Sequence, residues 1–140
     1  MRMRVLTHTN KGKLLAIADE VTKLIQADKP TDTIMPAYPC DGERLVVIIA
    51  SAKASMPDSF GRFVRSLKKS VTANVAFIID GTEENAAKIV EMAKTNNSNV
   101  IEDNILYITG GLPFKFAKKV SPEEMNSVRD WVATILKSLA

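Results

Sequence analysis

The stretch from Met3 to Asp19 constrains the fold more than any other, because it reads as a strand, a tight turn and a helix in succession. A short apolar run is followed by small polar residues and Gly12, and an apolar stripe at helical spacing begins at Leu14. This spacing predicts a helix over about residues 12–27. A helix N-terminus presents unpaired backbone N–H groups and partial positive charge, so the turn is suited to bind a phosphate or another anion.

The rest of the chain alternates strand-like segments with helical ones. Two of the strand-like segments, residues 45–50 and 75–79, are continuously apolar, which is typical of parallel strands covered on both faces. Such alternation favours one parallel sheet with helices on both sides. Besides the first strand, we expect strands at residues 31–35, 45–50, 75–79 and 105–109. Further helices are expected to begin with Pro57 in the first turn, and at the caps Thr82 and Ser121.

Capping residues mark two of these helix starts. Thr82 is suited to cap the helix that follows the fourth strand. Ser121 is followed by a proline at the first helical position and by Glu124 three residues later, which is the pattern of a capping box. Trp131 borders the apolar stripe of this last helix, so we expect it to pack in the core.

These patterns predict an α/β fold with three layers, α/β/α, around a five-stranded parallel sheet in the order 2-1-3-4-5. The helices after the first and last strands should lie on the same face. A chain of 140 residues is expected to form a single domain, residues 1–140. Ligands of such sheets bind beyond the C-terminal strand ends, so we expect the loops at residues 8–13, 51–56 and 80–84 to form the site.

Composition excludes several classes of function. The net charge of +3 comes without an arginine-rich block or interleaved aromatic residues, so we expect no nucleic-acid partner. One cysteine, Cys40, cannot form an intramolecular disulfide, and with a single histidine it cannot build a zinc cluster, so no metal site is expected. No segment has the pattern of a signal peptide, and no apolar run approaches the ~20 residues of a membrane span. We therefore expect a cytoplasmic protein without membrane insertion.

Three catalytic or signalling classes also fail on their residues. A phosphoacceptor receiver domain needs acidic residues at the first and third strand ends, where this chain has Thr7-His8 and Ala50-Ser51. No P-loop is present, because no Gly-Lys-Ser/Thr follows a four-residue spacer. A serine or cysteine hydrolase would have only His8 as its base, and no elbow motif surrounds a nucleophile.

The first loop, Thr9-Asn10-Lys11-Gly12-Lys13-Leu14, resembles the phosphate-binding Ser/Thr-x-Thr-Gly-x-Thr of the flavodoxin family. The stretch Ser51 to Leu67, with Met-Pro before Phe-x-x-Phe-Val-x-x-Leu, resembles that family's third strand end and helix. Gly110-Gly111-Leu112 is similar to the short flavodoxin-like domains that include the protoporphyrinogen-oxidase type. The resemblance covers nearly the whole chain and implies FMN as cofactor. The residues that it implies for cofactor binding are Thr9, Asn10, Lys11, Gly12, Lys13, Leu14, Ser51, Ala52, Lys53, Asp80, Gly81 and Thr82.

The phosphate loop departs from the family pattern at two hydroxyl positions. Lys11 and Leu14 stand where hydroxyl side chains are usual, which leaves Thr9 as the matching one. Lys11 and Lys13 could compensate at the phosphate by charge, as flexible point charges.

The loops that would hold the isoalloxazine ring also depart from the pattern. Lys53 occupies the position of a stacking aromatic in many flavodoxins, and Ala54 replaces the following glycine. The loop at residues 80–84 contains no aromatic and carries Glu83 and Glu84. Because stacking holds much of a planar ring, we expect FMN to be held weakly and mainly by its phosphate end.

Two functions of different kinds follow from this resemblance. The first is an FMN-binding electron carrier or small flavin oxidoreductase, with a redox-partner protein, in which the flavin supplies the chemistry. The alternative is a flavodoxin-like module without flavin that serves as a binding or regulatory domain. No catalytic residue can be assigned. His8 reads either as a strand-end residue or as a donor near a bound ring or phosphate, and Cys40 reads as a bystander thiol.

Overall fold

The computed structural model describes residues 3–7, 12–27, 30–33, 42–52, 58–68, 71–94, 99–108 and 120–139. Strands and helices alternate along the chain, as the apolar pattern predicted. In chain order the elements are β1 (Met3–Thr7), α1 (Gly12–Leu24), β2 (Asp32–Thr33), β3 (Glu43–Ser51), α2 (Asp58–Arg65), β4 (Thr72–Asp80), α3 (Glu83–Lys94), β5 (Asn99–Val100), the 3-10 helix η1 (Glu102–Asn104), β6 (Leu106–Ile108) and α4 (Pro122–Ser138).

The strands form one sheet in which every pairing between described strands is parallel. The order is β2-β1-β3-β4-β5, and β6 also pairs with β4. β1 therefore lies inside the sheet, between β2 and β3. The predicted order 2-1-3-4-5 is confirmed, with the fifth position occupied by two short strands in place of one.

The fifth position of the sheet is divided by η1. β5 pairs with the start of β4 at Asn74 and Val75, whereas β6 pairs with its end, from Ile78 to Asp80. The sequence predicted one strand here, at 105–109. In the structure Asn99 extends the sheet, since it pairs with Asn74 in the β4–β5 register, and its side-chain amide also donates a 2.7 Å hydrogen bond to Asn74 Oδ1.

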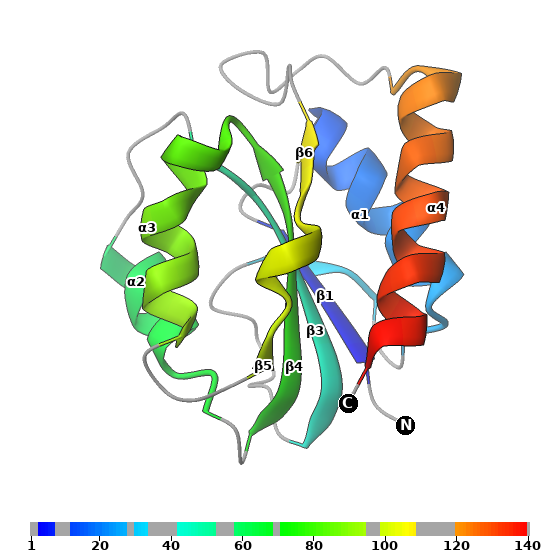
Figure 1. The fold of residues 1–140 in the computed structure, drawn as a ribbon. Coiled ribbons are helices and arrows are strands. Elements are labelled where there is room, and N and C mark those ends of the chain that lie inside the picture. Colours follow the sequence, from blue (N-terminus) through cyan, green and yellow to red (C-terminus); the bar gives the residue numbers. More distant parts are fainter. Residues whose placement is uncertain are drawn as a thin grey trace.

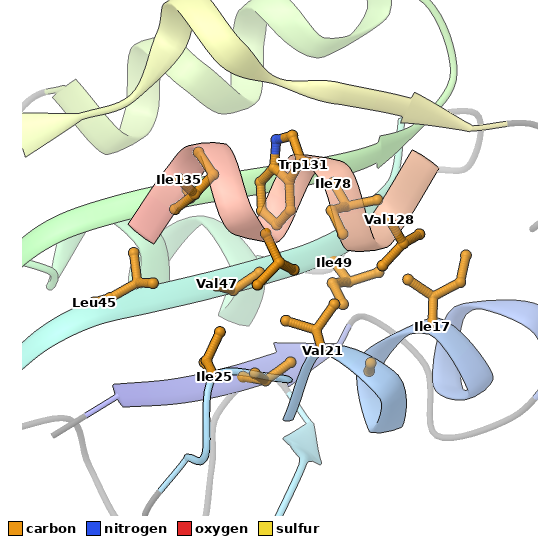
Figure 2. Packing of buried hydrophobic residues seen from close by; sticks show 14 of the residues in the cluster. Ile17, Val21, Ile25, Leu45, Val47, Ile49, Ile78, Val128, Trp131 and Ile135 are labelled. Atoms are coloured by element: carbon orange, nitrogen blue, oxygen red, sulfur yellow. The ribbon is translucent and has the colours of Figure 1, made fainter. Parts of the chain in front are cut away.

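The helices cover both faces of the sheet, α1 and α4 on one face and α2 and α3 on the other (Figure 1). Figure 2 shows the first of the two resulting cores, in which Trp131 and Val128 of α4 and Val21 of α1 pack over β3 and β4. Alternate residues of β3 serve opposite cores, so that Val47 lies in the first and Ile48 in the second. This explains why β3 is apolar along its whole length.

Local hydrogen bonds define the helix ends. α1 ends at Leu24, three residues before its predicted end, in a Schellman motif. Gln26 adopts a left-handed φ of 53°, and the N–H of Ala27 donates to the carbonyl of Thr22 at 3.1 Å. The expected end was wrong because a glutamine occupies the position that glycine usually marks.

Both predicted helix caps are confirmed. The N–H of Asn85 donates to Thr82 Oγ1 at 3.2 Å at the start of α3. At the start of α4, the N–H of Glu124 donates to Ser121 Oγ at 3.1 Å, and the Glu124 side chain accepts from the Ser121 N–H. In the part of the chain that the structure describes, no helix combines the length and the apolar character needed to cross a membrane.

Candidate functional site

The C-terminal ends of the parallel strands meet at one edge of the sheet, and α1 begins there. Figure 1 shows the arrowheads of β4 and β6 and the first turn of α1 at the same end of the molecule. The topology thereby brings together three of the predicted segments, residues 12–14, 51–52 and 80–82. This is the edge where doubly wound sheets bind their ligands.

A buried polar link joins the ends of β3 and β4 at this edge. Ser51 and Asp80 are paired in the sheet register, and both side chains have no solvent exposure. Ser51 Oγ donates to Asp80 Oδ2 at 3.0 Å, and the N–H of Ala52 donates to the Asp80 carbonyl at 3.0 Å. Buried hydrogen bonds to a carboxylate are strong and directional, so the two loops leave the sheet from a fixed base.

Gly81 permits the close approach of these two loops. Its φ is 151°, and a Cβ at this position would lie 3.3 Å from the Cβ of Ala52 and 3.6 Å from that of Asn85. The N–H of Gly81 donates to the carbonyl of Ile108 at 3.2 Å, which ties β4 to the end of β6. A side chain at this position would therefore press into the site.

The start of α1 has the geometry of an anion site. Gly12 opens the helix with a left-handed φ of 70°, which side chains rarely adopt. The first turn of α1 contains no acidic residue. The N–H groups of this turn have no intrahelical partner, because four residues at a helix start lack one. A helix start of this kind, opened by Gly12, suits a phosphate.

The side chains of Lys13 and Leu14 in this turn contact other parts of the chain. Leu14 is fully buried in the core, so only its backbone can serve a ligand. Lys13 is also buried, with its side chain 8% exposed, and its Nζ forms an ion pair with Glu124 Oε2 at the start of α4. The positive charge of Lys13 is therefore directed at a carboxylate of this chain, which weakens its predicted role at a phosphate.

The ion pair between Glu124 and Lys13 joins the starts of α4 and α1, and the two residues are 111 positions apart in the chain. Burial raises the pKa of this carboxyl, but the hydrogen bonds from Lys13 and Ser121 and the charge of Lys13 outweigh it and lower the pKa below its ordinary value. Sequence reasoning identified Glu124 from the capping box and missed its partner Lys13, since no local pattern signals a contact at this distance.

We expect Glu124→Gln to destabilise the protein at neutral pH and to remove part of its pH dependence. A carboxylate with a lowered folded-state pKa stabilises the fold above its unfolded pKa of about 4.3, and this is lost as the pH falls through the lower folded value. The loss in unfolding free energy should be about 1 kcal/mol at pH 7 and smaller at a pH below about 4.3, measured by urea denaturation. A difference that is equal at both pH values would contradict this assignment.

The remaining predicted side chains lie outside the described residues. These are the residues at positions 9–11 together with Lys53, and the same holds for His8, Cys40 and the segment 110–112. Their roles stay predictions. Among the described residues, no group of three or more metal-ligating side chains could hold a metal ion.

The fold places the chain in the class of doubly wound parallel α/β proteins. No protein-family model and no curated protein matches the chain. Among solved structures, the chain is similar to oxidised Flavodoxin 2 from Bacillus cereus, with a TM-score of 0.70 over 99% of this chain and 100% of that one, at 10% sequence identity. The chain therefore has a flavodoxin-like fold, and at this identity the likeness concerns the fold alone.

Proposed function

We propose that this protein binds FMN and acts in electron transfer or as a small flavin oxidoreductase. The observation that carries the proposal is the position of Gly12. Gly12 opens α1 with a φ of 70°, and the strand before it, β1, lies inside a flavodoxin-like sheet. This geometry suits a backbone cradle for the FMN phosphate.

Each part of the edge has a separate role in this proposal. The N–H groups of residues 12–14 bind the phosphate, and the first turn of α1 adds its partial positive charge. The Ser51–Asp80 link fixes the two loops that would flank the ring, and Gly81 keeps a side chain out of the space between them. The flavin, when bound, supplies the acceptance and donation of electrons.

Several features favour modest affinity that depends on the phosphate end. Lys13 already pairs with Glu124, and Glu83 and Glu84 place two carboxylates in the first turn of α3. The described residues of the three loops include no aromatic side chain. Each missing stacking pair removes about 0.5–1.5 kcal/mol, which weakens binding roughly two- to tenfold. An electron carrier of this kind also needs a redox-partner protein, which we propose as its partner.

A second candidate is a flavodoxin-like module without flavin, acting as a binding or regulatory domain. The Lys13–Glu124 ion pair favours it, because a cation next to the phosphate loop is neutralised within the chain. The acidic start of α3 points in the same direction, since negative charge disfavours an electron-rich reduced flavin.

Titration with FMN and riboflavin, at low and high salt, separates the two candidates. We expect the purified protein to quench FMN fluorescence with a lower dissociation constant than for riboflavin, and the FMN constant to rise with salt. Phosphate binding by exposed charge is screened over about 10 Å at 0.1 M salt, whereas ring contacts are not. Equal, salt-independent affinity for both flavins would contradict a phosphate-led site. If neither flavin binds, the module without flavin is the better account.

A further inference from the structure

β6 is an edge strand. It pairs with β4 on one side, and within the described ranges no strand pairs with its other side. Tyr107, at its centre, has 37% of its surface exposed. In Figure 1 β6 lies at the border of the sheet, between α3 and α4. Such an edge offers backbone N–H and C=O groups on which an extended chain can add a further strand.

A hollow lies on each side of this strand. The one on the α3 side has a volume of about 280 Å³ and is bordered by Tyr107, with Ala86, Val90 and Ile105 among its apolar lining. The one on the α4 side has a volume of about 290 Å³ and is lined by Leu106, Tyr107, Ile108, Glu124 and Ser127. Successive side chains of an added strand would point to opposite faces and so into the two hollows in turn.

The hollow on the α3 side is strongly acidic. Four carboxylates line it, and among the described residues the cation paired with them is Lys94. Lys94 Nζ is 3.2 Å from Glu102 Oε2 and 3.9 Å from Glu91 Oε1, so it offsets one of the four charges. Burial raises the pKa of Tyr107, and the charge of Glu83 raises it further, which agrees with a negative potential in this hollow. The four carboxylates are those of Glu83, Glu91, Glu102 and Asp103.

We call the β6 edge and its two hollows the groove, and the walls of this groove are held in place before any partner binds. The indole N–H of Trp131 on α4 donates to the carbonyl of Asn104 at 2.8 Å, which anchors η1 to the core. Lys94 links η1 to α3 through Glu102. A preformed groove lowers the ordering cost of binding, because only the incoming segment must become ordered.

We propose that the β6 edge binds an extended basic segment of a partner protein, which adds a strand to the sheet. Its basic side chains lie in the acidic hollow on the α3 side, and the alternating apolar ones lie in the α4 hollow over Leu106 and Ile108. A second copy of this chain fits less well, because pairing of two β6 edges would bring the acidic hollows together. The proposal does not depend on flavin binding, and its failure leaves the FMN site untouched.

The test uses a fluorescein-labelled peptide of alternating lysine and valine and the full-length protein. We expect fluorescence anisotropy to show that this peptide binds and that its affinity falls with salt. A peptide of alternating glutamate and valine should bind roughly tenfold more weakly or not at all. Methylation of alternate backbone amides, which keeps the charge and removes strand donors, should weaken binding by roughly tenfold as well. Equal binding of the methylated peptide would overturn the added strand.

Variants of the protein locate the groove. Glu83→Gln and Asp103→Asn, both at exposed residues, should each weaken the lysine–valine peptide by roughly threefold. Asp19→Asn removes an exposed charge on α1, away from the groove, and should leave the peptide affinity unchanged. Equal effects of all three variants would show attraction by overall charge and overturn the proposal. A dimer in sedimentation that the lysine–valine peptide dissociates would assign the β6 edge to a second copy and overturn the proposal too.

Discussion

Replacing Gly12 with valine is expected to lower the affinity for FMN by roughly tenfold or more. Gly12 has a φ of 70°, a conformation that strains a β-branched side chain. The backbone must then leave this region, and the N–H groups of the first turn of α1 move away from their common direction. The measurement is a fluorescence titration of FMN with the variant and the parent protein.

Gly42→Val is the matched control for this experiment. Gly42 has a φ of 75°, and a Cβ at this position would meet nothing within 4 Å, so its strain is confined to the backbone. It precedes β3, at the N-terminal end of the strands, whereas Gly12 lies at their C-terminal end. The control should lose stability to a comparable degree and keep its FMN affinity. Equal FMN affinity in Gly12→Val and the parent would remove this turn as the phosphate site.

The largest loss of stability is expected from Phe77→Ala. Phe77 lies in the middle of β4 with no solvent exposure and packs in the core beneath α2 and α3. Truncation of a buried phenylalanine costs about 3–5 kcal/mol, because it removes apolar contacts and leaves a cavity. This is a large part of the free energy of unfolding of a typical domain, which is roughly 5–15 kcal/mol. Urea denaturation followed by circular dichroism should show a lower midpoint with an unchanged slope.

Phe77→Leu provides the comparison for this loss. It keeps an apolar side chain of nearly the same volume, so the loss should be about 1.5 kcal/mol or less. If both variants lost the same stability, the site would not be close-packed as the structure has it.

The sheet could be predicted because its central strands carry an unambiguous signal. β3 serves a core on each face, so its sequence from Leu45 to Ala50 is apolar throughout and could be recognised without any partner. β5 could not be predicted, because it is only two residues long and its polar Asn99 is paired with a residue 25 positions away, Asn74. The end of α1 was missed for a similar reason, since Gln26 takes a left-handed conformation that its type does not signal.

In the candidate site, too, the positions of residues were predictable from the sequence and their side-chain partners were not. The positions of Gly12, Ser51 and Asp80 at one edge follow from strand order, and strand order was predictable from local pattern. The charge balance at the edge was not predictable. Lys13 was expected to face a phosphate, and it pairs with Glu124 because the folding of α4 against α1 brings these two helix starts together.

The most direct test of the central claim is a nuclear magnetic resonance titration that reads the backbone amides of the first turn of α1. In the ¹⁵N-labelled protein, added FMN should shift the amide signals of Gly12, Lys13 and Leu14, since hydrogen bonding to a phosphate perturbs each donor N–H. Riboflavin, which lacks the phosphate, should leave these three signals in place. If FMN and riboflavin shift the same signals, or if FMN leaves the first turn of α1 unperturbed, the phosphate site is not there.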